Sequence, residues 1–401
     1  MYHGQDMLLS EEVNMKHKFI SKRYWKDIST PMGQVDGLAK NYHDVINLSL
    51  GDPDIITHEI IIDNAFKDAK AGHTKYTDFR GDPELRNEIV KYYKEEYDMK
   101  VSDEEIFITT SGCLAMYLAL EAILDDGDEV IIQAPYFTPY PQQVELARGV
   151  PVFLNTYEEE DFQINMERLE SIITERTKAI IINSPCNPTG NILSLKTLEK
   201  IRDIAVKHDL LVISDDIYTS FSFNEPFIPI ASIDGMKERT IVINSFSKNF
   251  TMTGWRLGNI VAPNYIVNVV QQINENMVFT SPSISQRGAI YALRNRDVIQ
   301  PEMIKEYRER VTYAAGRINS IENMSVLKPK GTFYLFINIK KTNLSSAQVS
   351  DMILSEAHVL TIPGNSFGEC GEGYIRIACT VGIEKLKEAF DRIENMNIFK
   401  K

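Results

Sequence analysis

The chain has 401 residues, of which 43% are hydrophobic and 25% charged; this is ordinary for a globular protein, and the length is enough for two domains. Its formal net charge of −13 argues against nucleic acid as the main partner, because a phosphate backbone binds basic surfaces. The N-terminus lacks the pattern of a signal peptide, and no apolar run approaches the roughly 18 residues of a membrane span, so we expect neither secretion nor a membrane.

The segment up to about residue 60 shows no strand pattern that could form a sheet of its own, and we expect it to pack against the C-terminal part of the chain. Between residues 61 and 292, short runs rich in Ile and Val alternate with amphipathic helical stretches, such as those at 165–175 and 195–208. These runs lack polar alternation, which is typical of strands covered on both faces. The predicted strands are 129–133, 151–154, 178–183, 210–215, 240–244 and 258–262.

Beyond residue 292 the pattern changes to a smaller α+β unit. Its predicted elements are helices at 302–322, 346–356 and 383–395 and strands at 331–339 and 374–379. The fold class is therefore α/β, with a mainly parallel, helix-covered sheet and a smaller α+β domain. The predicted division is an N-terminal arm and part of the small domain at 1–60, a large domain at 61–292 and a small C-terminal domain at 293–401.

The four cysteines show no CxxC spacing, and the seven histidines show neither HExxH nor any other paired ligand spacing. Four cysteines in a chain of this length do not make a disulfide framework. We therefore expect free thiols, a reducing compartment, a cytoplasmic location and no metal site.

Polar residues follow three of the predicted strands, where an open parallel sheet binds its ligands. In chain order they are Asn183 and Asn187, then Asp215, Asp216 and Tyr218, then Ser245, Ser247 and Lys248. Each alone has an ordinary structural alternative: a turn at Asn-Pro-Thr-Gly, solvated aspartates and a surface lysine. Together they place an amide, a carboxylate, a phenol and an amine at one edge of the sheet.

This combination suits a cofactor that carries an aldehyde, a pyridine ring and a phosphate. A neutral lysine amine can form a Schiff base with an aldehyde, and a carboxylate can keep a ring nitrogen protonated. A phosphate needs hydroxyls, backbone N–H groups and an arginine. Ser245, Ser247 and Arg256 meet that need, as does Ser111-Gly112-Cys113 before a strong helical stretch. The alternative for Ser111 is an ordinary helix cap.

Six motifs in order along nearly the whole chain resemble fold-type I pyridoxal-phosphate enzymes, and most closely the class I and II aminotransferases (the aspartate/aromatic aminotransferase family). They are INLSLGDPD, KYTDFRGDPELR, NSPCNPTG, SDDIY, SFSKNFTMTGWRLG and GEGYIRIAC. The resemblance implies that Lys248 is the Schiff-base lysine and proton shuttle, that Asp215 is the partner of the pyridine nitrogen, and that Tyr218 and Asn187 donate to the ring oxygen.

The resemblance also assigns the remaining contacts of the cofactor pyridoxal 5′-phosphate. It implies a phosphate site that includes Ser245, Arg256, Gly112 and Cys113, although Cys113 stands where many relatives have threonine or another small residue. Phe137 resembles the aromatic residue that stacks on the cofactor ring, with Tyr136 as the alternative. Tyr76 resembles the tyrosine that reaches the phosphate in the neighbouring subunit, which implies a homodimer with shared sites.

For the substrate, Arg376 resembles the arginine that binds the α-carboxylate, Gly51 the glycine whose backbone lies against it, and Asn187 a further contact. The implied reaction moves an amino group from an L-amino acid (aromatic, neutral or aspartate-like) to a 2-oxo acid such as 2-oxoglutarate by a ping-pong mechanism. Leu114 stands where some relatives that take dicarboxylic substrates have lysine, which favours neutral, aromatic or broad specificity.

Three other functions are open to the sequence. One is a pyridoxal-phosphate-dependent carbon–sulfur β-lyase, although MTGWRLG resembles the transaminase form of this loop more closely. Another is a cofactor-binding regulator, for which the roughly 45 residues before the first motif leave too little chain for a DNA-binding module. The third is a nicotinamide enzyme, which is disfavoured because no GxGxxG opens a strand–helix unit.

Overall fold

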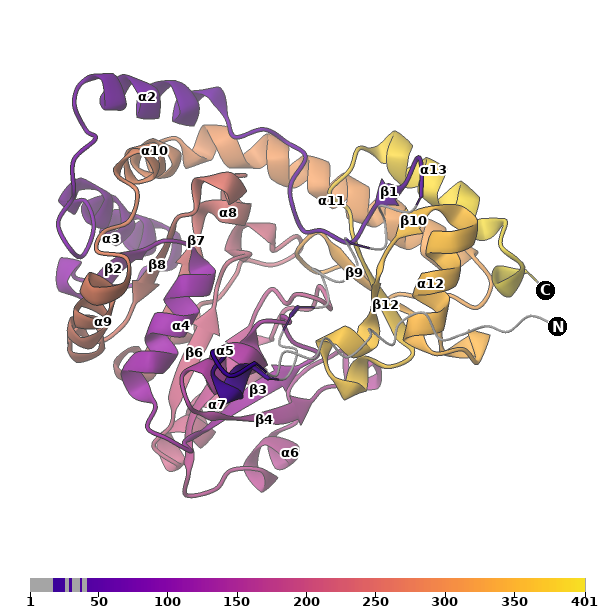
Figure 1. The fold of residues 1–401 in the computed structure, drawn as a ribbon, viewed down its shortest axis with the longest axis horizontal. Coiled ribbons are helices and arrows are strands. Elements are labelled where there is room, and N and C mark those ends of the chain that lie inside the picture. The colour runs from indigo at the N-terminus through magenta and orange to yellow at the C-terminus, as the bar shows by residue number, and fades with distance from the viewer. Residues whose placement is uncertain (1–16, 26–28, 31–36, 38–41, 401) are drawn as a thin grey trace.

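The structure is a computed structural model that describes residues 17–25, 29–30, 37 and 42–400. Much of the predicted N-terminal arm, including residues 1–16, lies outside the described residues. A seven-stranded sheet occupies the middle of the chain, and a small three-stranded sheet lies near its C-terminal end (Figure 1). Within the described part of the chain, no helix combines the length and the hydropathy that crossing a bilayer requires.

The large sheet has the strand order β2-β8-β7-β6-β5-β3-β4. Its strands β3 to β7 run parallel, and β8 is antiparallel to both of its neighbours. The predicted mainly parallel sheet is therefore confirmed. The strands are β2 (Ile106–Thr109), β3 (Glu129–Ala134), β4 (Val150–Asn155), β5 (Thr177–Asn183), β6 (Leu211–Asp215), β7 (Thr240–Ser245) and β8 (Gly258–Val261).

Strand β8 reverses direction because its link from β7 contains no crossover helix. Only the one-turn helix α8 (Phe246–Asn249) and a 3-10 turn at Thr253–Trp255 separate the two strands. A parallel neighbour needs a connection of a dozen or more residues that returns to the other end of the sheet, and this link stays at one end. The signature stretch around Lys248 therefore lies at the carboxyl edge of the parallel strands.

Helices cover both faces of the large sheet, as the continuous apolar runs of its strands predict. Along β5, Ala179 and Ile181 pack in the cluster with α4, α5 and α9, whereas Ile180 and Ile182 pack with α6 and α7. Helices α3 and α10 cover the rest of the second face. These helices are α3 (Pro83–Tyr97), α4 (Gly112–Ile123), α5 (Tyr140–Leu146), α6 (Met166–Ser171), α7 (Leu195–Lys207), α9 (Asn264–Met277) and α10 (Ser283–Arg294).

The C-terminal part forms the predicted smaller unit around the antiparallel order β11-β12-β9. The long helix α11 (Arg296–Ser320) begins six residues before the predicted start and contains Pro301. The other elements are β9 (Tyr334–Asn338), α12 (Ser346–Ala357), β10 (Val359–Leu360), β11 (Ile362–Pro363), β12 (Tyr374–Ala378) and α13 (Ile383–Glu394), and α2 (Glu59–Lys70) lies against α10.

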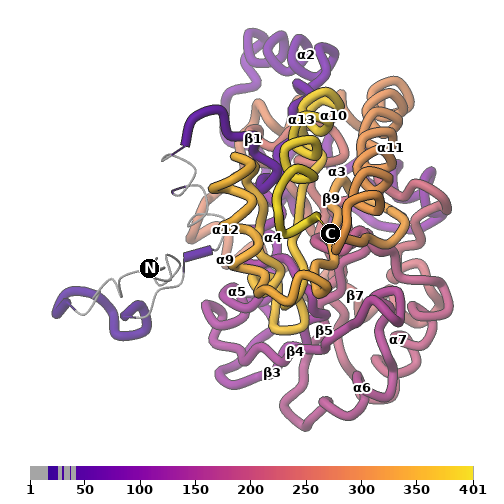
Figure 2. The backbone as a smooth tube through the Cα atoms, turned by 90° about the vertical axis from the view of Figure 1, so that its right-hand side faces the viewer, coloured from indigo at the N-terminus to yellow at the C-terminus, as the bar shows by residue number. Residues whose placement is uncertain are grey.

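The N-terminal segment is not wholly without sheet structure, because β1 (Ile46–Asn47) pairs in parallel with β10. Figure 2 shows β1 beside α12 and α13, two helices of the smaller unit. Leu48 continues the contact, since its N–H donates to Leu360 O and its carbonyl accepts from Ala378 N at 2.7 Å. These bonds position the next residues, Ser49 to Asp52, between the two sheets.

Candidate active site

A cavity of about 440 Å³ opens at the carboxyl edge of the large sheet and faces the smaller unit. The predicted site residues line it, with the exception of Tyr76. Its walls come from the ends of β5, β6 and β7, the start of α4, the stretch around Gly51, and strands β9 and β12. The lining residues are Leu50, Gly51, Asp52, Ser111, Gly112, Cys113, Phe137, Asn183, Asn187, Asp215, Ile217, Tyr218, Ser245, Ser247, Lys248, Thr253, Gly254, Arg256, Tyr334 and Arg376.

Strand register brings the polar strand ends together. Asn183 at the end of β5 is in register with Asp215 at the end of β6. The Asn183 side chain donates to the Asp215 carbonyl at 2.9 Å and accepts from the Asn187 N–H at 2.8 Å. The amide that the sequence places after β5 is thereby fixed beside the carboxylate that ends β6.

Asp215 is 4% exposed and holds two hydrogen bonds. The Tyr140 hydroxyl donates to one carboxylate oxygen, and the Ile217 N–H donates to the other at 3.2 Å. Burial disfavours the charged form and raises the pKa of Asp215 to about 6, although both donors act in the opposite direction. A carboxylate in this setting gains strongly from a cationic partner, such as a protonated ring nitrogen.

The N-terminus of α4 forms one side of the cavity. Ser111 caps the helix with φ of +83°, and its hydroxyl accepts from the Leu114 N–H at 3.4 Å. The first backbone N–H groups of a helix, here those of Gly112 and Cys113, have no intrahelical acceptor and attract anions. A Cβ on Gly112 would lie 2.8 Å from the terminal methyl of Ile217, so a larger residue here would have to displace that side chain.

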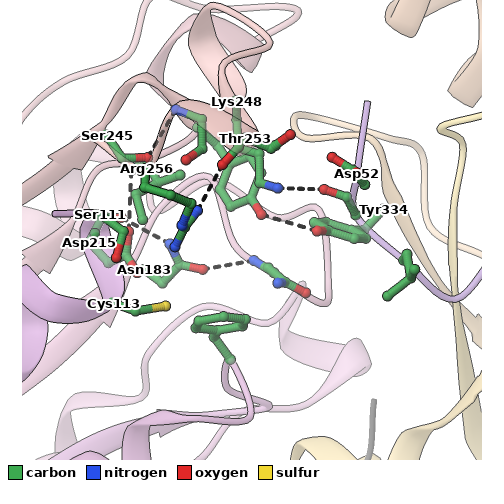
Figure 3. A pocket seen from close by; sticks show the side chains of 18 of the residues that line it. Asp52, Ser111, Cys113, Asn183, Asp215, Ser245, Lys248, Thr253, Arg256 and Tyr334 are labelled. Atoms are coloured by element: carbon green, nitrogen blue, oxygen red, sulfur yellow. Dashed lines mark hydrogen bonds between the residues drawn. The ribbon is translucent and has the colours of Figure 1, made fainter. Parts of the chain in front are cut away.

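Ser245, Ser247 and Arg256 complete the anion site next to α4. Figure 3 shows Ser111, Ser245 and Arg256 on one side of the cavity, opposite Tyr334 and Asp52. Arg256 donates to the Thr253 carbonyl at 2.8 Å, and none of the ion pairs within the described residues includes it. Hydroxyls, helix N–H groups and an arginine without a carboxylate partner are the donor set that a phosphate requires.

Lys248 projects into the cavity and donates to the Gly51 carbonyl. Burial of the ammonium lowers the pKa of Lys248 to about 8, and the charges of Arg256 and Arg376 act in the same direction. The Asp52 carboxylate opposes this shift. Near neutral pH the amine is thus far closer to its neutral, nucleophilic form than an exposed lysine is.

This environment predicts the pH dependence of Lys248 in the cofactor-free protein. The rate of reaction with an aldehyde should rise with pH and level off above about 8, because the lowered pKa makes half of the amines neutral there. Asp52→Asn should move the midpoint to lower pH, since it removes the negative charge that favours the ammonium. Reductive trapping followed by mass spectrometry of the Lys248 peptide measures this rate.

The matched control is Glu59→Gln, which removes the same charge from the exposed first turn of α2 and should leave the midpoint unchanged. A midpoint near the ordinary lysine value of 10.5 in the wild-type protein would contradict the assignment.

Arg376 lies on the opposite wall, in the central strand of the small sheet, and is 1% exposed. Its guanidinium donates to the Asn187 side-chain oxygen at 3.0 Å and to the Ser49 carbonyl. The rings of Tyr334 and Phe367 lie 4.5 Å and 4.9 Å from it. These neighbours fix a planar fork that suits a carboxylate.

The two aromatic residues considered for cofactor stacking have different surroundings. Phe137 lines the cavity and packs edge-on against Tyr140 at 5.6 Å. Tyr136 instead stacks on Phe153 at 5.3 Å. Tyr218, with its hydroxyl 3.1 Å from that of Tyr334, also lines the cavity.

Tyr76 is not brought to the site of its own chain. It is 80% exposed and lies edge-on to Phe279, with ring centroids 4.9 Å apart. Phe79 contacts the same Phe279 ring at 5.0 Å. These three residues form an exposed aromatic cluster between the start of α3 and the link from α9 to α10.

Sequence reasoning missed several residues of the cavity. Asp52 and Tyr334 are among them, and the sequence motifs also assign no role to Tyr140, which donates to Asp215 without lining the cavity. Asp52 directly follows the predicted Gly51, so its position was a usable signal. The contacts of Tyr140 and Tyr334 depend on long-range packing, which no local pattern reports.

Comparisons with known proteins agree with this geometry. The family described as "Aminotransferase class I and II" matches residues 43–393. An aspartate aminotransferase of Pyrococcus abyssi is 42% identical over 90% of this chain and 93% of its own length. Aromatic-amino-acid aminotransferase 2 of Thermococcus litoralis is 39% identical over the same shares. The crystal structure of an aromatic aminotransferase from Pyrococcus horikoshii aligns with a TM-score of 0.86 at 40% identity, covering 90% of this chain and 97% of that one.

The fold, the cavity and these relatives lead to one assignment. The chain belongs to the class I and II aminotransferases, a pyridoxal-phosphate-dependent family of fold type I.

Proposed function

We propose that the cavity binds pyridoxal 5′-phosphate with its aldehyde at Lys248, its ring nitrogen at Asp215 and its phosphate at the start of α4. The observation that supports this most strongly is that an amine, a buried carboxylate and an anion site line a single cavity. When bound, the cofactor supplies an electron sink that stabilises the negative charge left on the substrate when a proton leaves its Cα.

At the ring, Asp215 keeps the nitrogen protonated, and the hydrogen bonds from Tyr140 and the Ile217 N–H hold the carboxylate in place. Tyr218 and Asn187 donate to the ring oxygen. Phe137 packs on the ring face and keeps water from it.

At the other end of the cofactor, the backbone N–H groups of Gly112 and Cys113 bind phosphate oxygens. The hydroxyls of Ser111, Ser245 and Ser247 and the Arg256 guanidinium add side-chain donors. This proposal is supported by the position of these groups around one part of the cavity.

Residues on the side of the cavity around Arg376 bind the substrate, and Lys248 transfers the proton. Arg376 and Asn187 hold the α-carboxylate of the amino acid, with the backbone of Gly51 beside it. Lys248, as a neutral amine, would take the proton from the substrate Cα as a general base and, once protonated, would donate it as a general acid. Its low pKa supports this exchange near neutral pH.

The proposed donor is an aromatic, neutral or aspartate-like L-amino acid, and the proposed acceptor is a 2-oxo acid such as 2-oxoglutarate, in a ping-pong sequence. Relatives named for aspartate and for aromatic amino acids are both similar to this chain. Leu50, Phe137 and Ile217 add apolar surface to the cavity, which supports neutral and aromatic side chains.

The purified protein is expected to absorb near ~420 nm, because the cofactor carries its own chromophore and the protein only tunes it. Amino donors should then form glutamate from 2-oxoglutarate in a coupled assay. A β-lyase would instead release pyruvate and ammonia from cystathionine without any 2-oxo acid. That result, or a protein that binds no cofactor, would contradict the proposal.

We further propose a homodimer in which Tyr76 of each chain reaches the cofactor phosphate of the other. The exposed aromatic cluster of Tyr76, Phe79 and Phe279 supports this, because rings exposed together on one face favour burial against a partner.

We also propose a cytoplasmic location and a division of the chain into three segments. All four cysteines are free, which supports a cytoplasmic protein. The proposed segments are residues 1–60, 61–292 and 293–401. It is supported by the separate large sheet at 106–261 and small sheet at 334–378.

A further inference from the structure

Tyr334 contacts residues on two sides of the cavity: the side proposed to hold the cofactor ring and the side proposed to bind the substrate carboxylate. It is the first residue of β9 and is buried, and it lies across the small sheet from Ala378, two residues after Arg376. Its hydroxyl is 3.1 Å from the Tyr218 hydroxyl, and its ring faces the Arg376 guanidinium at 4.5 Å. One side chain therefore contacts a residue of the cofactor wall and a residue of the carboxylate wall.

The backbone around Tyr334 is held in a strained conformation. Thr332 is fully buried with φ of +58°, which is unfavourable for a β-branched residue. Its N–H donates to the Phe221 carbonyl at 3.1 Å, and its hydroxyl accepts from the Tyr334 N–H at 3.0 Å. Strain of this kind persists only where the surroundings fix the position, and here they fix the start of β9.

The hydroxyl end of Tyr334 is confined as tightly as its backbone. A Cβ on Gly51 would lie 1.7 Å from the Tyr334 hydroxyl oxygen, so only glycine leaves room for it. The same Gly51 offers its carbonyl to Lys248. The Tyr334 side chain thus fills the gap between the Gly51 backbone, Tyr218 and Arg376.

The direction of the hydroxyl–hydroxyl bond follows from the proposed function, on which this inference rests. If Tyr218 donates to the cofactor's ring oxygen, its single proton is used there. The bond to Tyr334 must then run from the Tyr334 hydroxyl to the Tyr218 oxygen. Donation into that oxygen polarises Tyr218 and turns its proton toward the cavity.

We propose that Tyr334 is a positioning residue with two separable tasks: its hydroxyl orients the Tyr218 proton toward the cofactor, and its ring orients Arg376 for the substrate carboxylate. The hydroxyl affects the bound cofactor, and the ring affects substrate binding. If Tyr334 only filled space, removing its hydroxyl and removing its ring would not affect the cofactor and substrate binding separately.

Two variants of the holoenzyme test the division. Tyr334→Phe keeps the ring and removes the hydroxyl. It should raise the midpoint of the pH-dependent absorbance change of the bound cofactor by about half to one pH unit, because a weaker Tyr218 donor stabilises the charged ring oxygen less. Affinity for 3-phenylpropanoate, a carboxylate without an amino group, should stay within about twofold.

Tyr334→Leu removes the ring as well. It should weaken 3-phenylpropanoate binding about tenfold, through loss of the cation–π contact and of the fixed guanidinium. Absorbance titration of the holoenzyme measures this binding. Tyr374→Phe is the matched control, because it removes a buried hydroxyl from β12 in the same small sheet, outside the cavity. It should change neither quantity.

The inference is overturned if Tyr334→Phe leaves the absorbance midpoint at the wild-type value, or if Tyr334→Leu binds the carboxylate as tightly as wild type. It is also overturned if Tyr374→Phe shifts the midpoint as far as Tyr334→Phe does. Should the leucine variant not fold, the phenylalanine variant alone decides. A wild-type protein that fails to bind the cofactor or transfer amino groups refutes the proposed function instead, so the two failures are distinguishable.

Discussion

A Lys248→Ala variant is expected to bind the cofactor and yet lose amino transfer by about 10⁴-fold or more, because it lacks both the nucleophile and the proton-transfer group. The anion site and Asp215 do not involve this side chain, so noncovalent binding of the cofactor should persist. Equilibrium dialysis or absorbance measures binding, and single-turnover kinetics with an amino acid measures the transfer step. Near-wild-type turnover would refute the assignment of Lys248.

The control variant is Lys237→Ala, which removes a lysine that pairs with Glu105 outside the cavity and should leave the rate unchanged.

The Lys248→Ala variant also tests whether the two chains of the proposed dimer share their active sites. In a mixed dimer of Lys248→Ala and Tyr76→Ala chains, one site has an intact Lys248 and receives Tyr76 from the other chain. Activity at limiting cofactor should therefore recover on mixing, whereas independent sites would show no recovery.

An Asp215→Asn variant is expected to lower kcat by about 10²–10³-fold, because a neutral amide cannot hold the ring nitrogen's proton through the reaction. The apparent affinity for the amino acid should change by no more than about threefold, since the contacts of Arg376 remain. Steady-state kinetics separate the two quantities. An unchanged kcat would remove Asp215 from the mechanism.

The raised pKa of Asp215 also determines in which direction Asp215→Asn changes the stability of the fold. Burial raises the pKa from 3.8 to about 6 in the cofactor-free protein, so the ionised carboxylate destabilises the fold as pH rises through that range. The variant should thus be no less stable than wild type at neutral pH, which separates lost activity from unfolding. Asp216→Asn is the control, because Asp216 is buried beside it, bonded to Ser214 at 2.5 Å, and outside the cavity.

The sequence predicted the sheet where hydrophobic runs are long and continuous. Strands β3, β5, β6 and β7 follow directly from such runs, because both of their faces are covered by helices. Strand β2 was missed, since Ile106–Thr109 is a run of only four residues. The reversal of β8 depends on the short link after β7, which residue type alone does not reveal.

The candidate site was predictable to the extent that its residues follow strand ends. Asn183, Asp215 and Ser245 meet because register in a parallel sheet aligns those ends. Tyr334 was not predictable in this way, because it begins a strand of the other sheet and reaches the cavity through the packing of two units. Asp52 could have been placed near the site because it follows Gly51, but the effect of its charge on the pKa of Lys248 depends on the packing of the two units.

The origin of the two walls has a thermodynamic consequence. The proposed cofactor contacts within one chain come from the large sheet and α4, whereas Arg376 and Tyr334 belong to the small sheet and Gly51 to the segment beside it. A bound amino acid contacts both units. Its binding therefore raises the free energy that is needed to open the small unit locally, by mass action. The small unit therefore becomes more resistant to opening when substrate is present.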